Sequence, residues 1–316
     1  MSPHRAAALR IRDISPRLAL QAHMTSTAHK VELVNRLSQS GVGAIEVSSF
    51  VRRKLVPGLS DAEAVFDQID RPASVSFECC VANMSGLNRA ISAGADVAWF
   101  LLSVDEQFSR NNIGRTVEES LVELAEMNAA AERSGIRLGT YIIAAAGGPA
   151  GPARGRGELE PLMKRLVDIG VLDWIVADSF GYAAPSQALL IAELACEYTT
   201  PERLVFQIHD VRGMGVANVV ALASAGFVNI DTALAGSGGH PAMPHARVGG
   251  VCTEDAVQAL ELSGHPTGID LSSLIEHANW FDSTIGAPTL GFVRHGWPVP
   301  TEPADPTRTE AFAWPP

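Results

Sequence analysis

The chain has 316 residues, 47% of them apolar and 19% charged, a composition that allows a sizeable buried core and argues against disorder. The formal net charge of −11 argues against general nucleic-acid binding, which needs a basic face, but a few arginines can still hold a small anionic substrate. No stretch is apolar for long enough to span a bilayer, and no apolar signal core precedes Asp13. We therefore expect a soluble cytoplasmic protein that does not contact a membrane.

Eight short apolar runs alternate along the chain with longer segments of helical periodicity. Most of the runs are apolar on both faces, as expected for parallel strands that are covered on both sides. The predicted strands are residues 8–14, 44–47, 74–81, 97–104, 137–144, 174–177, 204–208 and 228–233.

Helical periodicity is clear in residues 29–40, 117–134, 159–170 and 185–198, and several helical segments end at a glycine suited to a left-handed cap. These glycines are Gly41, Gly94, Gly135, Gly170 and Gly226. Eight strand–helix units predict an α/β fold of the (β/α)8 TIM-barrel type, a single domain over residues 1–287 followed by a C-terminal extension, residues 288–316. A doubly wound open sheet is the competing architecture, but no glycine-rich fingerprint follows the first strand.

Polar side chains gather where the predicted strands end, which is where a barrel of this kind carries its active site. Taken singly, each is explained equally well by a strand end that meets water or by a helix cap. Together, an arginine, several carboxylates and a histidine at one rim favour an active site. The candidates are Arg17, Gln21, Glu46, Ser48, Asn83, Tyr141, Asp178, His209, Asp210 and the loop 235–241.

Two of these features are the most informative. Glu46 follows an apolar pair at a predicted strand end, so a buried carboxylate there needs a partner, and Arg17 on the neighbouring strand is the natural one. The loop 235–241 places five small residues before His240, which allows the loop to move and carry the histidine over the site. A tight turn with an exposed histidine, or a phosphate cradle, are the other interpretations of this loop.

Over residues 11–287 these motifs resemble those of 3-hydroxy-3-methylglutaryl-CoA lyase and, more broadly, of the metallolyase barrels related to isopropylmalate synthase. The matching segments include DISPRLALQ at 13–21, AIEVSSFV at 44–51, DSFG at 178–181, AGSGGHP at 235–241 and TED at 253–255. The resemblance implies a retro-aldol cleavage in which a divalent metal binds the substrate oxygens and acts as a Lewis acid.

Several positions depart from that family's pattern. Leu18 replaces a metal-binding aspartate, Gln207 the first of two metal-binding histidines, and Gly250 falls at or near a metal-binding asparagine. The second histidine remains as His209, while His240 replaces the catalytic loop cysteine. We therefore expect no tightly bound divalent ion and no other cofactor. The alternative is a metal site rebuilt from His209 with Asp13, His23, His240 or His245.

The leading hypothesis is a diverged carbon–carbon lyase or aldolase-type enzyme that acts on a small carboxylated or acyl-CoA substrate. Its predicted catalytic residues are Arg17, Glu46, His209, His240 and Asp178, and its predicted substrate-binding residues are Gln21, Ser48, Asn83, Tyr141 and Gln207. In this scheme Arg17 binds a substrate oxygen, Glu46 holds Arg17, and His209 or His240 handles the proton. A non-catalytic barrel that binds a ligand or a partner, and an isomerase or hydrolase in the same pocket, are the alternatives. The sequence leaves the oligomeric state open, including a homo-oligomer.

Overall fold

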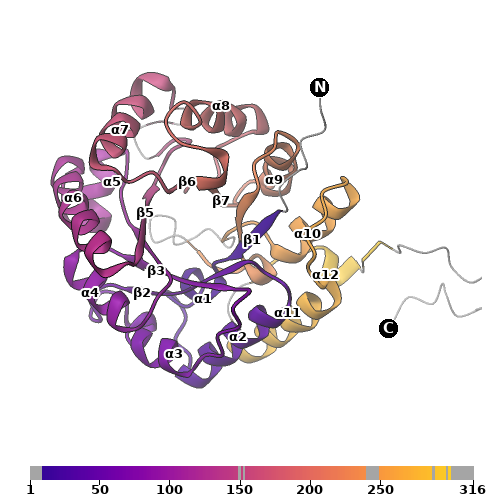
Figure 1. Ribbon diagram of the computed structural model, residues 1–316. Helices are drawn as coiled ribbons and strands as arrows, with labels where there is room; N and C mark the ends of the chain where they lie inside the picture. Colours follow the sequence, from indigo (N-terminus) through magenta and orange to yellow (C-terminus); the bar gives the residue numbers. More distant parts are fainter. Residues whose placement is uncertain are drawn as a thin grey trace, which may run out of the picture.

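A computed structural model describes residues 9–148, 151, 154–239, 249–286, 289–296 and 298–299. In it, eight parallel strands pair in chain order, and the last strand pairs with the first to close a barrel. The strands are β1 Arg10–Asp13, β2 Ala44–Phe50, β3 Ser76–Val81, β4 Val97–Phe100, β5 Arg137–Ile142, β6 Trp174–Asp178, β7 Leu204–Ile208 and β8 Asn229–Thr232. All eight predicted strands are present, so the TIM-barrel prediction is confirmed and the open sheet is excluded (Figure 1).

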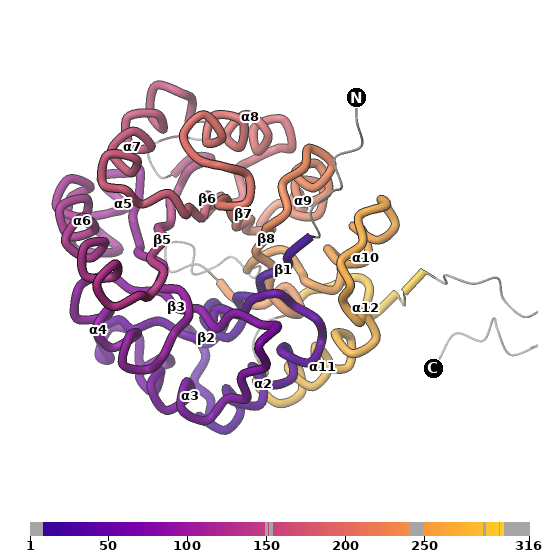
Figure 2. The backbone as a smooth tube through the Cα atoms, viewed as in Figure 1, coloured from indigo at the N-terminus to yellow at the C-terminus, as the bar shows by residue number. Residues whose placement is uncertain are grey.

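The helices form a ring around this barrel, and the chain moves around the ring in sequence order (Figure 2). They are α1 Ser15–Leu18, α2 Thr27–Gln39, α3 Ala62–Gln68, α4 Met84–Ser92, α5 Glu106–Ile113, α6 Val117–Ser134, α7 Arg156–Ile169, α8 Pro185–Ala195, α9 Gly215–Ser224, α10 Thr253–Leu262, α11 Leu271–Ile285 and α12 Val293–Gly296. Three short 3-10 turns are η1 Pro57–Leu59, η2 Pro201–Arg203 and η3 Leu234–Gly236. In the part of the chain that the structure describes, no helix combines the length and apolar character that a membrane span requires.

Local sequence signals account for the helix ends. Helix α6 begins with a capping box in which the Thr116 hydroxyl accepts from the Glu119 N–H and the Glu119 carboxylate accepts from the Thr116 N–H. It ends at Gly135, whose φ of 78° is left-handed and suits a residue without a Cβ. The other four glycines expected as caps also have left-handed φ angles, between 69° and 94°.

Regular structure continues beyond the last predicted strand–helix units and past Trp280. Helix α11 runs to Ile285 and packs against α2 and α10, so it closes the ring between the first and last units (Figure 1). The segment that follows is attached to the barrel, because the Asp255 carboxylate accepts from the N–H groups of Phe292 and Val293 at 2.9 and 2.8 Å. Helix α11, before the predicted boundary at residue 288, and the segment around Phe292, after it, therefore both pack on the helix ring.

Candidate active site

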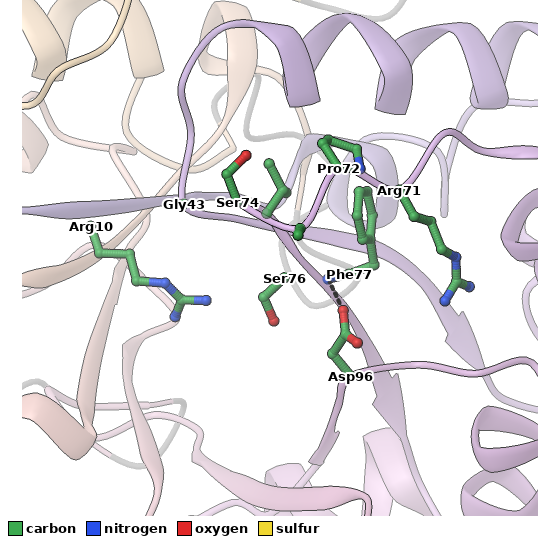
Figure 3. Close-up of a pocket in the computed structure, with 10 residues that line it drawn as sticks. Arg10, Gly43, Arg71, Pro72, Ser74, Ser76, Phe77 and Asp96 are labelled. Atoms are coloured by element: carbon green, nitrogen blue, oxygen red, sulfur yellow. Dashed lines mark hydrogen bonds between the residues drawn. The ribbon is translucent and has the colours of Figure 1, made fainter.

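Two sizeable pockets open at opposite ends of the barrel. The one at the amino ends of the strands has a volume of about 450 Å³, with Arg10 and Arg71 on opposite sides (Figure 3). Its charged groups are already paired: Arg10 contacts Glu78 at 3.2 Å, Arg71 donates to three backbone carbonyls, and Asp96 accepts from the Phe77 N–H at 2.7 Å. This end of such barrels contributes to stability rather than to catalysis.

The larger pocket, of about 720 Å³, lies at the carboxyl ends of the strands. A pocket of this size at this end is the expected location of an active site in a TIM barrel. It brings together six of the residues predicted from sequence, namely Arg17, Gln21, Asn83, Tyr141, Gln207 and His209. Within this set, Asn83 also caps α4 through a bond from the Gly86 N–H, and Gln21 donates to the Gly239 carbonyl at 3.3 Å.

The floor of this pocket is a bonded triangle of Arg17, Glu46 and Tyr141. Arg17 lies on α1 directly after β1; its Nε donates to Glu46 Oε2, and its Nη2 donates to the Tyr141 hydroxyl at 3.0 Å. The Tyr141 hydroxyl in turn donates to Glu46 Oε1 at 2.6 Å. The expected Arg17–Glu46 pair is therefore present, although Glu46 lies inside β2 and not at its end.

The protonation state of Glu46 follows from this triangle. Desolvation by complete burial raises its pKa, but the guanidinium groups of Arg17 and Arg12 and the Tyr141 hydroxyl more than offset this effect and lower the pKa to about 2. Glu46 is therefore a carboxylate at neutral pH and holds Arg17 in place without carrying a proton.

Arg12 is a central residue that the sequence analysis did not identify. Its guanidinium is completely buried and contacts Glu46 at 2.5 Å, Glu78 at 2.6 Å and both oxygens of Asp231 at 2.7 Å. The Trp99 ring lies 5.3 Å from it, and the Trp99 indole N–H donates to Glu78. The available signal was the presence of charged residues within apolar strands, at positions 12, 78 and 231, where an inward side chain must find a buried partner.

Cys80 also lies at the pocket floor. Its thiol donates to Glu46 Oε1 at 3.2 Å, and burial raises its pKa well above the usual range, so it stays protonated. This environment suits a buried, unreactive cysteine. Cys79 and Cys252 are also buried, and Cys196 is half-buried.

Ser48 and Asp178 do not line this pocket, and neither does Glu46, which meets it only through Arg17 and Tyr141. The strand register shifts between Glu46 and Ser48, and after this irregularity it is Ser49 that faces the pocket. Asp178 closes the turn after β6, because its carboxylate accepts from the N–H groups of Tyr182 and Ala183, both at 2.9 Å. Of the remaining candidates, Asp210 accepts from the Gly215 N–H where α9 begins, and His240 lies outside the described residues.

The residues around position 18 do not fit a divalent metal. Leu18 packs with Ile14 and Ala233 in a small apolar cluster, and Gly250, which has no side-chain ligand atom, faces the same side chain. A Cβ built on Gly238 would lie 2.7 Å from Leu18 Cγ, so Leu18 fills the space beside these glycines. A metal site needs several oxygen, nitrogen or sulfur donors. Within the described ranges, no three His, Cys, Asp or Glu side chains are placed to hold one.

Only some of the residues that could rebuild the metal site lie in the part of the chain that the structure describes. Asp13 is buried, and its carboxylate already accepts from the Ser15 hydroxyl at 2.5 Å and from the Thr253 hydroxyl at 2.7 Å. His245, like His240, lies outside the described residues. The rebuilt metal site therefore gains no support from the residues that the structure describes.

The base of the loop 235–241 rests on a buried carboxylate without a cationic partner in the described part of the chain. Glu254 Oε2 accepts from the Ala235 N–H at 2.8 Å and from the Cys252 thiol at 3.2 Å. Ala235 has a left-handed φ of 57°, which a non-glycine residue adopts only when its surroundings hold it there. Burial raises the pKa of Glu254 to about 7.

This raised pKa predicts a specific dependence of stability on pH. The folded protein holds the Glu254 proton up to about pH 7, whereas the unfolded chain releases it near pH 4.5, so stability falls as pH rises through this window. The isosteric Glu254→Gln variant keeps an oxygen acceptor for Ala235 and cannot ionise. Relative to wild type, its free energy of unfolding should rise by about 3 kcal/mol between pH 4.5 and 8. Urea denaturation of both proteins across this range measures the difference, and a constant offset would contradict the assignment.

A closed barrel with an arginine fixed on the floor of its carboxyl-end pocket has the architecture of a TIM-barrel enzyme. The chain belongs to the HMGL-like family, which matches residues 8–280. It is 32% identical over 304 residues to (R)-citramalyl-CoA lyase of Chloroflexus aurantiacus, covering 92% of this chain and 96% of the relative. It is 30% identical over 280 residues to hydroxymethylglutaryl-CoA lyase of Bacillus subtilis, covering 88% and 93%.

Solved structures agree with this placement. An HMG-CoA lyase from Acinetobacter baumannii, in complex with coenzyme A and 3-methylmalate, superposes with a TM-score of 0.89 at 29% identity, over 97% of this chain and 100% of that one. An HMG-CoA lyase from Pseudomonas aeruginosa gives a TM-score of 0.86 at 26% identity, over 92% and 97%. The resemblance inferred from the motifs is confirmed, and the chain is a member of a carbon–carbon lyase family.

Proposed function

We propose that the protein cleaves a carbon–carbon bond of a 3-hydroxyacyl-CoA thioester by a retro-aldol reaction that does not use the family's divalent metal. The observation that carries the proposal is the fixed guanidinium of Arg17 at the pocket floor, held by Glu46 and Tyr141. The names of the relatives support this substrate class, because hydroxymethylglutaryl-CoA and citramalyl-CoA are both CoA thioesters with a hydroxyl group and one free carboxylate.

The proposed reaction balances with groups in the pocket. A base removes the hydroxyl proton, the O–H electron pair forms a carbonyl, and the adjacent carbon–carbon bond breaks. The bond's electrons move to the thioester as an enolate, whose carbon then takes a proton, so the products are a carbonyl compound and a shorter acyl-CoA. Arg17 binds the oxygen on which negative charge develops. His209, buried at the pocket wall, is the proposed proton carrier in the described part of the site, and His240 stays the second candidate.

The charge of the pocket suits an anionic substrate despite the acidic composition of the whole chain. Arg115 is neutralised by Glu123 at 2.8 Å. Arg52 is exposed at the pocket wall, and among the described side chains it has no carboxylate partner. One uncompensated guanidinium at the rim attracts the phosphate or carboxylate groups of an acyl-CoA substrate.

In a non-catalytic barrel we expect the side chains that line the former active site to fill the pocket. The volume of about 720 Å³ beside Arg17 counts against that alternative. Leu18 and Gly250 support the absence of a metal step, because neither residue has a side-chain donor atom at the positions where the resemblance places two of the family's ligands.

The test is a panel of 3-hydroxyacyl-CoA thioesters and the corresponding free hydroxy acids, with cleavage followed by mass spectrometry, each with and without EDTA. We expect cleavage of at least one CoA thioester at a rate that EDTA does not change. Loss of activity on chelation that Mg²⁺ or Mn²⁺ restores would return the protein to the metal-dependent mechanism. Tight binding of CoA thioesters without any cleavage would instead support the non-catalytic barrel.

A further inference from the structure

Gln207 has a buried amide nitrogen whose hydrogen-bonding capacity is not used within the described residues. The side chain is 5% exposed and lines the carboxyl-end pocket, yet its Nε2 has no hydrogen-bond partner there. A buried donor left without a partner destabilises a folded protein, and native structures seldom keep one without a reason. A buried donor that faces a ligand pocket is satisfied when a bound ligand supplies the acceptor.

The neighbouring strands explain why no side chain of the barrel satisfies this amide. In the strand register Gln207 lies between Ala177 on β6 and Asp231 on β8. Ala177 has no polar atom in its side chain, and both Asp231 oxygens already accept from Arg12 at 2.7 Å. His209, two residues further along the chain and directly after β7, lines the same pocket as Gln207. The amide is therefore placed between a small apolar residue and a carboxylate that another residue already engages.

We propose that Gln207 is a catalytic residue whose Nε2 donates a hydrogen bond to the thioester oxygen as it becomes an enolate oxygen, beside the guanidinium of Arg17. The inference rests on the proposed function and names the groups that stabilise the oxyanion where the metal donors are missing. Two fixed donors aimed at a developing negative charge stabilise a transition state more than a ground state. An amide does not titrate, so this stabilisation is independent of the proton that His209 carries.

The test compares Gln207→Leu, which keeps the approximate volume and removes the donor, with Gln187→Leu as a matched control. Gln187 donates from α8 to the Ala146 carbonyl at 3.1 Å and does not line the pocket. We expect Gln207→Leu to lower kcat by about 100-fold with little change in KM, and Gln187→Leu to leave both unchanged. Gln207→Leu should also keep or raise the denaturation midpoint, because it removes an unsatisfied buried donor. A large loss of stability would assign Gln207 a structural role instead.

A binding measurement separates this inference from the proposed function. The probe is an acetyl-CoA analogue that carries a carboxylate in place of the thioester carbonyl and so mimics the enolate, and its affinity is measured by calorimetry beside that of CoA alone. We expect Gln207→Leu to bind the probe at least about 10-fold more weakly and CoA equally well. Equal probe affinity and unchanged kcat would overturn the inference even if wild type cleaves a substrate. A Gln207-dependent probe affinity without any cleavage would support the anion site and contradict the lyase proposal.

Discussion

Replacing Arg17 by lysine should lower kcat/KM by on the order of 1000-fold for the substrate that the wild type cleaves. The Arg17 guanidinium donates to Glu46 and Tyr141 at the same time and still presents a face to the pocket. A lysine ammonium is a point charge that cannot hold both partners in one plane, so the cation leaves the position in which it meets the developing enolate. This loss corresponds to about 4 kcal/mol of transition-state stabilisation.

Steady-state kinetics measures the effect, and Arg89→Lys is the matched control. Arg89 also forms a two-pronged pair, through Nε and Nη2, with Glu63 at 2.6 and 3.0 Å, but it does not line the pocket. The control variant should keep near wild-type kcat/KM. If Arg17→Lys keeps wild-type turnover and affinity, Arg17 does not bind the reacting oxygen and the proposed function loses its main support.

Replacing Arg12 by methionine should lower the free energy of unfolding by about 4 kcal/mol. The substitution leaves three buried carboxylates, Glu46, Glu78 and Asp231, without the guanidinium that joins them. Glu46 keeps Arg17 and Glu78 keeps Arg10, but Asp231 loses its cationic partner among the described residues. The desolvation of the three carboxylates and their mutual repulsion are then only partly compensated. Urea denaturation at neutral pH measures the change.

The neighbouring Arg10 provides the comparison. It pairs with Glu78 at 3.2 Å, but its side chain is 35% exposed, so Arg10→Met should cost less than about 1 kcal/mol. Adding Asp231→Asn to Arg12→Met should recover part of the loss, because one uncompensated charge is removed. Equal destabilisation by Arg10→Met and Arg12→Met would show that the buried network does not depend on Arg12.

Predictability from sequence differed between the two sides of the strands. Side chains that face the helices follow a continuous apolar pattern, which is why runs such as 204–208 were recognised as strands and β7 has the same bounds. Inward residues such as Arg12 and Asp231 are charged positions within otherwise apolar runs, so they do not alter the strand prediction. The role of each depends on the residue that it contacts across the barrel, and these two partners are separated by 219 positions in the chain.

The same limit explains the outcome at Ser48 and Asp178. Both residues were predicted from the rule that polar groups at the carboxyl end of a strand face the active site, yet neither lines the pocket. The register irregularity in β2 changes which serine faces the pocket, and Asp178 turns to its own following backbone. Local irregularities of one residue are set by the fit between neighbouring strands, which a single segment of sequence does not contain.

The sequence by itself determined the number and order of the strands, five of the helix C-termini, the family and the pairing of Arg17 with Glu46. These features depend on periodicity, on caps and on motifs that are local in the chain. Only the tertiary structure decided that Arg12 joins three carboxylates and that Leu18 occupies space beside Gly238. It also decided that the Gln207 amide lacks a partner among the described residues. The physical reason is that closing the barrel brings distant inward side chains into one water-poor volume, where each charge and donor must find a partner from another strand.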